Sequence, residues 1–324
     1  TLFNNGQGGI IRPVLVKGDR IDYRFGADYQ LTNDLMVYAS VASGYRPGAF
    51  NPRPFQASQL VPVAEEEMVA YELGFKGDFF DRRLRLNVAG FYSDYSSRIV
   101  SKSGSECINN GTTGNCITPG TQVDPAVTGG AELCRAYNPA TDGPVDLSSG
   151  IGVACISKTN YVNSPGKVKG FEVEVEARPI DGLTFNLAGG YTHFDAPELR
   201  NDPLVVNQTP VYVPQWTGSA GIQYEIPVEA LGGSITPRID GFYQSKISFN
   251  SRSPIAQIPG RAVFNGRISY QNAGGDWSVA VGATNLFNKQ YYYNIFDLVP
   301  FGQPTTEAQP GRPREWYLSV RKSF

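Results

Sequence analysis

The feature that most constrains the fold of this chain is the ordering of the connections between its strand-like segments. Eleven segments carry the period-two alternation of apolar and polar side chains that is typical of β-strands. Their approximate ranges are 20–30, 35–45, 67–78, 84–98, 164–178, 183–194, 212–226, 233–247, 260–271, 276–289 and 312–324. Helical periodicity of useful length is lacking, so the sequence predicts an all-β protein.

Short and long connections follow each other in strict alternation. The short ones are 31–34, 79–83, 179–182, 227–233 and 272–276, and several contain the Asp-Gly or Gly-Gly pairs that suit tight turns. The long ones are 46–66, 99–163, 195–211, 248–259 and 290–311. In an antiparallel sheet, this order places all tight turns at one end and all long loops at the other. Such an arrangement is typical of outer-membrane β-barrels, which have short periplasmic turns and long extracellular loops.

The segment KGFEVEVEARP, residues 169–179, shows what the two faces of a strand would meet. Its glutamates line one face, and phenylalanine and valine line the other. A soluble sandwich would turn the glutamates to water, whereas a barrel would turn them to a polar lumen and the apolar face to lipid. A lipid-facing Arg or Lys would cost about 2–4 kcal/mol at mid-bilayer, so charged strand residues are predicted to face the lumen. These residues are Arg85, Glu172, Glu174, Glu176, Arg238 and Arg267.

Aromatic residues support a barrel in a membrane. The chain has 18 Tyr, 18 Phe and 3 Trp, and many fall near the ends of the expected strands, where aromatic girdles lie at the two membrane interfaces. The residues predicted to form these girdles are Tyr92, Tyr95, Tyr191, Phe194, Trp216, Tyr224, Tyr243, Trp277 and Trp316.

Several classes of function are disfavoured by composition and motifs. The net charge is −2, which does not favour nucleic-acid binding. There is no P-loop, no GxSxG, no HExxH and no dinucleotide fingerprint, so we expect no enzyme, no cofactor and no metal site. The one histidine, His193, is expected at a strand end rather than in a site. An apolar run of the roughly 20 residues that a transmembrane helix needs is also missing.

All four cysteines lie in the longest connection, 99–163. They are Cys107, Cys116, Cys134 and Cys155, and their spacing does not resemble a zinc site. Four cysteines allow three pairings, of which sequence proximity favours Cys107–Cys116 with Cys134–Cys155. Disulfides suit an exported loop in an oxidising compartment, where they would restrict a loop too long to order itself.

Several stretches of the chain resemble the TonB-dependent outer-membrane receptor family. They are YRFGADYQLTNDLMVYASVASGYRPGAFN (23–51), EEEMVAYELGFKGDFFDRRLRLNVAGFYSDY (65–95), VKGFEVEVEARPIDGLTFNLAGGYTHFD (168–195) and WSVAVGATNLFNKQYYYNIF (277–296). The final GRPREWYLSVRKSF, ending in Phe324, resembles the signal that the outer-membrane assembly machinery reads, although Lys322 departs from a strictly apolar alternation. The resemblance covers residues 20–324.

The resemblance implies an antiparallel transmembrane β-barrel of twenty-two strands that follows a plug domain and a TonB box. Eleven strands would form the C-terminal half of such a barrel. Residues 1–19 are then the end of an extracellular loop, residues 20–324 are the barrel part, and the plug domain is absent from this chain. Because open sheet edges are not tolerated in lipid, we expect the remaining barrel half and plug to come from the same gene or from a companion chain.

The resemblance further implies import of a scarce nutrient, most often a ferric siderophore, across the outer membrane of a Gram-negative bacterium. The implied partners are the TonB complex, the assembly machinery, the lipid bilayer and lipopolysaccharide. Tyr45, Arg46, Phe50 and Arg53 are candidate ligand-binding residues, since arginines with aromatic side chains suit an anionic chelate; capping of the aromatic girdle is their alternative role. Haem, cobalamin or oligosaccharide are alternative cargoes, and a non-transporting adhesive β-protein is the alternative class.

Overall fold

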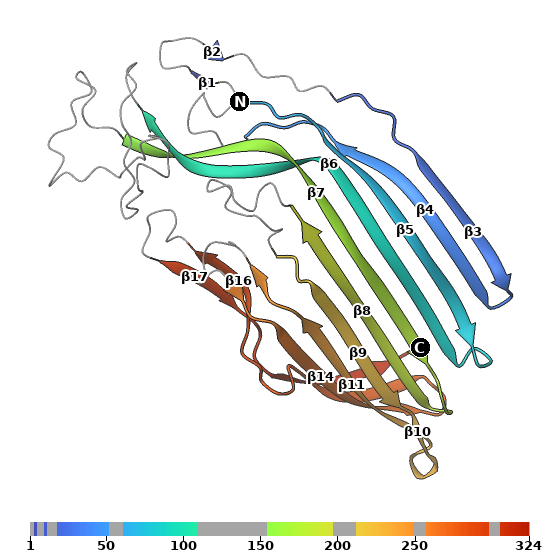
Figure 1. Cartoon of the computed structure of the whole chain (residues 1–324). Coiled ribbons are helices and arrows are strands. Elements are labelled where there is room, and N and C mark those ends of the chain that lie inside the picture. Colours follow the sequence, from blue (N-terminus) through green and yellow to red (C-terminus); the bar gives the residue numbers. More distant parts are fainter. Residues whose placement is uncertain are drawn as a thin grey trace.

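The computed structural model describes residues 3–4, 10–11, 18–51, 61–108, 154–196, 212–248, 257–297 and 305–323. Its main feature is one antiparallel sheet of twelve strands, in which eleven form a continuous path and neighbours in the chain are neighbours in the sheet (Figure 1). Along the chain these eleven are β3 (Arg24–Thr32), β4 (Leu35–Arg46), β5 (Glu66–Phe79), β6 (Leu84–Ile108), β7 (Ala154–Ala177), β8 (Leu183–Asp195), β9 (Trp216–Tyr224), β11 (Gly233–Gln244), β14 (Arg261–Asn272), β15 (Trp277–Thr284) and β18 (Glu315–Lys322). The predicted all-β barrel fragment is thus confirmed.

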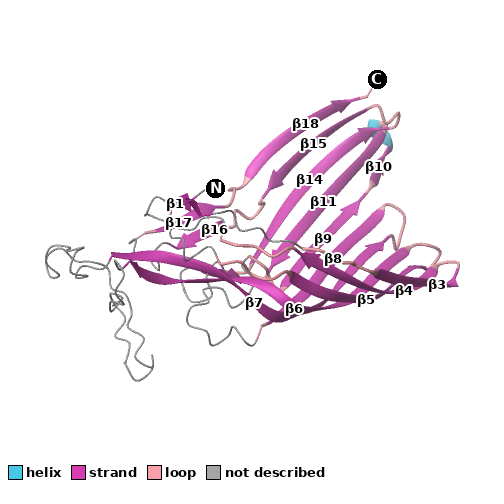
Figure 2. Cartoon of the chain, turned by 90° about the horizontal axis from the view of Figure 1, so that it is seen from above, coloured by secondary structure: helices cyan, strands magenta, loops and turns pink. Residues whose placement is uncertain are grey.

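Shorter elements accompany this sheet. β10 (Ile226–Val228) pairs with β11 and follows β9 after one residue, and the 3₁₀ turn η3 (Glu229–Leu231) closes that connection. Three two-stranded pairs lie apart from the main sheet: β1 (Phe3–Asn4) with β2 (Ile10–Ile11), β12 (Ile247–Ser248) with β13 (Gln257–Ile258), and β16 (Tyr292–Asp297) with β17 (Thr306–Pro310). Seen from above, the sheet curves from β3 to β18, and these two strands are its edges (Figure 2).

The tight turns gather at one end of the strands, as the sequence predicts. Their geometry depends on left-handed residues, of which Gly182 is the most constrained. Its φ is +79°, and a Cβ there would lie 2.6 Å from the carbonyl oxygen of Glu225. Only glycine fits both demands, so the β7–β8 turn is fixed by its Asp-Gly pair. We call this end of the sheet the turn end and the opposite end the loop end.

The longest connection differs from the prediction. β6 and β7 continue past their expected ends, pairing from Arg98 opposite Ser164 to Ile108 opposite Ala154. Much of the predicted loop 99–163 is therefore a two-stranded arm that projects beyond the other strands at the loop end. A register irregularity between Tyr95 and Arg98 marks where the arm begins. Irregularities of this kind bend a strand, which accounts for the change of direction.

Strand β15 is shorter than predicted, ending at Thr284 rather than 289. Asn285 and Asn288 adopt left-handed φ values of 47° and 52°, which end the extended conformation. Asn tolerates this region better than most residues. The tight turn that results places Leu286 and Phe287 beside β14, where the Phe287 ring meets Phe264 edge to face at 5.4 Å.

One face of the sheet consists largely of exposed apolar side chains. Leu318, Val320 and Leu73 are 71%, 69% and 67% exposed. A soluble domain would bury such residues, and a contiguous apolar surface of this extent marks a membrane or interaction surface. Within the described residues, no helix has the length and hydropathy needed to cross a membrane.

Candidate functional site

The strand register sorts the side chains onto two faces. Partner residues in an antiparallel pair lie on the same face, and Arg85 is opposite Glu176 while Arg238 is opposite Arg267. The register through β8 and β9 connects these two pairs on one face. We call this the polar face; it carries all the charged residues predicted to face a lumen, namely Arg85, Glu172, Glu174, Glu176, Arg238 and Arg267. The opposite side is the apolar face.

On the polar face near the turn end, charged groups pair within the sheet. Arg85 Nε donates to Asp78 Oδ1 at 2.8 Å, and Arg178 Nη2 donates to Glu176 Oε1 at 2.7 Å. Asn87 Nδ2 donates to Glu174 Oε2 at 3.1 Å. These groups hold one another in place, and because they are exposed each pair contributes little to stability.

Arg238 is fixed more firmly than the other arginines of this face. Its Nε and Nη2 donate to the two carboxylate oxygens of Asp240 at 2.9 and 2.6 Å, and Nη1 donates to Gln223 Oε1 at 2.8 Å. Gly221 makes room for the pair, since a Cβ there would lie 2.7 Å from Asp240 Oδ1. Its neighbour Arg267 is exposed and takes part in none of the ion pairs formed among the described residues. On the polar face, the guanidinium of Arg238 is therefore fixed by hydrogen bonds, whereas that of its neighbour Arg267 is exposed and forms no ion pair with the described residues.

The sequence-predicted ligand residues occupy the loop end of β4. Arg46 Nη2 lies 2.7 Å from Glu66 Oε2, which also accepts the backbone N–H of Ile99 at 2.9 Å. This contact joins β4, β5 and β6 at the rim. Tyr45 precedes Arg46 in the same strand, so it lies on the apolar side, where it is 36% exposed. Phe50 is 38% exposed in the following segment, and Arg53 lies outside the described residues.

A cluster that sequence analysis missed lies at the loop end of β14. The guanidinium carbon of Arg261 is 4.7 Å from the ring centroid of Tyr291 and 5.5 Å from that of Tyr293. Arg261 Nη1 donates to the Tyr292 carbonyl at 2.7 Å, and the hydroxyls of Tyr291 and Tyr293 are 3.0 Å apart. Burial raises the pKa of Tyr291. We call Arg261, Tyr291 and Tyr293 the rim cluster.

The rim cluster rests on a preorganised support. The hairpins β12–β13 and β16–β17 meet through Ile247, Ile258 and Ile295, which are 7%, 1% and 8% exposed. The Tyr212 hydroxyl hydrogen-bonds Asn294 Oδ1 in β16, and burial raises the pKa of Tyr212. The two hairpins therefore form a packed wall at the loop end. A site held on such a wall is better suited to binding than one on a free loop.

A second arginine–aromatic pair lies where the β6–β7 arm leaves the sheet. The guanidinium carbon of Arg98 is 4.2 Å from the Phe194 ring centroid, and Phe194, like Val162, packs against the buried residues Val100 and Ala196. The register puts Phe194 opposite Val168 on the polar face, so its predicted place in a lipid-facing girdle is wrong. Phe194 lies instead on the polar face, at the loop end of β8.

The apolar face carries aromatic clusters at both ends of the strands. At the loop end, Trp216 lies 4.6 Å from Tyr191 and 5.8 Å from Phe171 between ring centroids. At the turn end, Tyr270 and Trp277 are 5.4 Å apart. Two bands of rings on one face match the girdles that such barrels place at membrane interfaces.

The cysteines of the arm are described only in part. Cys116 and Cys134 lie outside the described residues. The backbone register makes Cys107 and Cys155 direct partners across β6 and β7. Directly opposed residues of antiparallel strands have Cα atoms about 4.5–5.5 Å apart, which is within the Cα separation that a disulfide spans.

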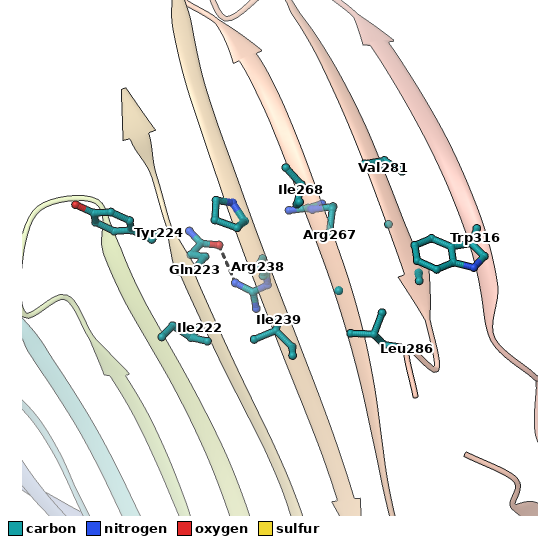
Figure 3. A pocket seen from close by; sticks show the side chains of 14 residues that line it. Ile222, Gln223, Tyr224, Arg238, Ile239, Arg267, Ile268, Val281, Leu286 and Trp316 are labelled. Atoms are coloured by element: carbon teal, nitrogen blue, oxygen red, sulfur yellow. Dashed lines mark hydrogen bonds between the residues drawn. The ribbon is translucent and has the colours of Figure 1, made fainter. Parts of the chain in front are cut away.

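A groove of about 450 Å³ crosses the outside of β9, β11, β14, β15 and β18 (Figure 3). Apolar-face residues dominate its lining, including Ile222, Ile239, Ile268, Leu286 and Trp316. It exists because Gly266 and Ala283 are small where their neighbours are large. We call this the apolar-face groove; it lies across the sheet from the rim cluster and is separate from it.

The signal that identifies the rim cluster in the sequence is weak. The run Tyr291, Tyr292 and Tyr293 lies in a long connection, where neither period-two alternation nor a motif links it to Arg261. Only the hairpin that β16 and β17 form brings the two together. Among the described residues, no group of three or more His, Cys, Asp or Glu side chains could hold a metal ion.

Comparison with known proteins identifies the family. A sequence profile described as TonB dependent receptor-like, beta-barrel, matches residues 4–286. The Ferric-pyoverdine M114 receptor PbuA of Pseudomonas sp. (strain M114) is 27% identical over 312 residues, covering 92% of this chain and 29% of that protein. The Pesticin receptor of Yersinia pestis is 35% identical over 75 residues, covering 23% of this chain and 11% of the receptor.

Solved structures agree on the fold. The ferric yersiniabactin uptake receptor FyuA from Yersinia pestis superposes with a TM-score of 0.61 at 18% identity, covering 93% of this chain and 37% of that one. FpvA of P. aeruginosa bound to heterologous pyoverdines superposes with a TM-score of 0.60 at 20% sequence identity, covering 98% of this chain and 34% of that one. The chain thus spans about a third of the proteins it resembles. It belongs to the TonB-dependent receptor family, whose members are outer-membrane β-barrels, and it contributes part of the barrel.

Proposed function

We propose that the receptor to which this chain belongs imports a ferric siderophore across the outer membrane, with energy supplied through TonB. The observation that carries the proposal is the 27% identity with a ferric-pyoverdine receptor across 92% of this chain. A match that covers nearly the whole barrel portion includes the strands and the loops between them. The fold alone would not carry this proposal, because one fold hosts many functions.

In this proposal the polar face lines the lumen and the apolar face meets lipid. Carboxylates and guanidinium groups on the polar face remain solvated there, whereas lipid would exclude them. A plug domain would contact this wall from inside, and TonB would act through the plug. The remaining strands would pair with the free edges of β3 and β18, since unpaired backbone groups find no partner in lipid.

We propose that the rim cluster binds the cargo, together with the candidate residues at and after the loop end of β4, which are Tyr45, Arg46 and Phe50. Siderophores present anionic, planar chelating groups, and a guanidinium with two aromatic rings provides charge and a flat contact surface together. Arg261 has this environment, with Tyr291 and Tyr293 beside it. Arg46 is already paired with Glu66, so we assign it a supporting role at the rim.

The test is uptake of radioactive iron by cells. A strain lacking the full-length gene would be supplied with iron bound to pyoverdine-type, catecholate, phenolate and hydroxamate chelates in turn. We expect uptake of one class to disappear and to return with the intact gene, and to be lost again in a strain without TonB. Unchanged uptake of every ferric chelate, with loss of haem or cobalamin uptake instead, would contradict the proposed cargo while leaving the transporter class in place.

A further inference from the structure

The charged side chains of the polar face are divided between two halves of the sheet. Below the rim, β5, β6 and β7 carry mostly carboxylates on this face, and their charged residues are Glu72, Lys76, Asp78, Arg85, Glu172, Glu174 and Glu176. We call this the acidic half. On β11, β14, β15 and β18 the charged residues below the rim on the same face are mostly arginines, namely Arg238, Asp240, Arg267 and Arg321. We call this the basic half.

Arg267 is a cation of the basic half without a partner of opposite charge. It lies directly opposite Arg238 across β11 and β14, and like charges directly opposite each other destabilise a sheet. Asp240 gives both carboxylate oxygens to Arg238, which also bonds Gln223 (Figure 3). Arg267 is exposed and joins no ion pair in the described part of the chain. A charge kept where it costs stability is typical of a functional position.

The surroundings of Arg267 add a phenol to this charge. Arg267 pairs with Gly282 of β15, and Gly282 pairs with Tyr317 of β18. The Tyr317 ring lies over Gly282, where a Cβ would overlap the hydroxyl, so the hydroxyl reaches from β18 across β15 toward β14. Guanidinium and phenol groups both donate hydrogen bonds to anionic oxygens. Arg267 and Tyr317 thus repeat, deeper on the polar face, the residue types of the rim cluster.

Arg267 also lies on the same strand and the same face as Arg261 of the rim cluster. Side chains an even number of residues apart project to one face of a strand. At roughly 3.3 Å per residue, the two arginines are about 20 Å apart along β14. The residues between them on this face are Val263 and Asn265, neither of which is charged. β14 therefore carries one cation at the loop end and a second one further toward the turn end, with no carboxylate of its own between them.

We propose that Arg267 and Tyr317 form a transit site, at which an anionic ferric chelate binds after it leaves the rim cluster on its way through the barrel. The inference rests on the proposed function and adds a route to it, along the basic half and away from the carboxylates of the acidic half. Arginines line the pores of anion channels, where each site must bind weakly enough to release the ion again. An exposed guanidinium without a counterion in the sheet meets that need, because the cargo displaces no internal ion pair.

The experiment separates binding of the cargo from its passage. It uses the full-length receptor in cells and the one chelate, among pyoverdine-type, catecholate, phenolate and hydroxamate ferric chelates, whose uptake requires the gene. Arg267→Gln should lower the maximal rate of iron uptake about fivefold, which corresponds to about 1 kcal/mol of barrier height. The dissociation constant of the chelate, measured on cells without TonB, should stay unchanged. Arg267→Lys keeps the charge and should retain most of the rate, whereas Arg267→Glu should lower the rate further.

Two controls test whether the effect belongs to this position and to passage. Lys76→Gln removes a cation from the acidic half on the same face and should leave uptake unchanged. Entry of vancomycin, which an intact outer membrane excludes, reports whether the barrel is still closed, and it should stay low in Arg267→Gln cells. All rates are divided by the amount of assembled receptor, so that poor assembly cannot imitate slow passage.

The outcomes distinguish the transit site from the function on which it rests. Normal uptake by Arg267→Gln cells, an equal loss in Lys76→Gln cells, or a loss of affinity that matches the loss of rate would overturn the transit site alone. Vancomycin entry into Arg267→Gln cells would also overturn it, because Arg267 would then hold the plug rather than the cargo. If none of the four chelates shows uptake that requires the gene, the proposed function fails and the transit site fails with it.

Discussion

Arg261 and Tyr291 form a contact between the end of one membrane strand and the loop that follows the next. Their 4.7 Å separation joins residues 30 positions apart, and the Tyr291 ring lies so close to Gly311 that a Cβ there would be 2.2 Å from the ring. The absence of a side chain at Gly311 therefore leaves room for the ring, which also packs against the guanidinium. Such preorganisation lowers the entropy cost of binding.

The first prediction concerns cargo affinity. Arg261→Gln keeps hydrogen-bond donors but removes the charge, so binding of an anionic ferric chelate should weaken by about tenfold, equivalent to roughly 1–2 kcal/mol. The measurement is the dissociation constant of the purified full-length receptor, together with uptake by cells. Arg82→Gln is the control, because Arg82 is exposed at the turn end beside Asp34. Equal affinities for the two variants would remove the rim cluster from the binding site.

The second prediction tests the two faces of β7. Val173 lies on the apolar face between Val88 and Gly189, and Glu174 lies on the polar face between Asn87 and Ala188. Val173→Arg should cost about 2–4 kcal/mol and reduce the assembled barrel. Glu174→Gln should change stability by about 1 kcal/mol or less. The fraction of receptor that stays folded in unheated detergent is the measurement for both variants, and an equal loss for the two would contradict the assignment of the apolar face to lipid.

The third prediction concerns the arm. The register opposes Cys107 to Cys155, so we expect a disulfide between them, which leaves Cys116 to pair with Cys134. This differs from the pairing that sequence proximity favours. Peptide mapping of the unreduced receptor would distinguish the two, since a peptide linking residue 107 to residue 116 appears only in the proximity pairing. Four titratable thiols in the denatured, unreduced protein would contradict both.

The fourth prediction is a pH dependence at the turn end. Lys322 Nζ donates to Asp276 Oδ2 at 2.9 Å, and this bond, followed by one from Asn272, lowers the pKa of Asp276 below its usual range. A lowered pKa stabilises the fold above the unfolded value of about 3.9, and this stabilisation is lost as the pH falls through the folded value. In unfolding curves, wild type should therefore be more stable than Asp276→Asn at about pH 6, and this difference should shrink as the pH falls toward and below about pH 3. Asp181→Asn, in another turn, serves as the control, and a difference that stays constant with pH would count against the ion pair.

The strands were predictable because local chemistry fixes their ends. Leu84, Leu183 and Gly233 begin strands at the predicted residues, since each follows a tight turn whose glycine, aspartate or left-handed residues permit few alternatives. Alternation between those turns also predicted which residues share a face. Both signals are local in the sequence, and the membrane reinforces them by excluding any other arrangement of the backbone.

The rim could not be predicted in the same way. Arg98 and Phe194 are separated by the whole arm, and Arg261 meets Tyr291 only through a hairpin in a long loop. No periodicity connects residues across such loops. The arm itself escaped prediction because its strands carry polar residues on both sides, as in SKSGSE. Beyond the membrane, neither face needs to be apolar, so the alternation that marks a strand is lost.

The arm formed by β6 and β7 has a consequence for how a cell surface is encountered. Its pairing runs from Arg98 to Ile108, and at roughly 3.3 Å per residue this corresponds to about 33 Å of strand beyond the bend. In the outer-membrane orientation proposed above, a macromolecule that approaches from the medium would meet this ribbon before it met the rim cluster. The segment of this chain that reaches farthest beyond the sheet would then be a different one from the segment proposed to bind the cargo, and the two could change independently in sequence.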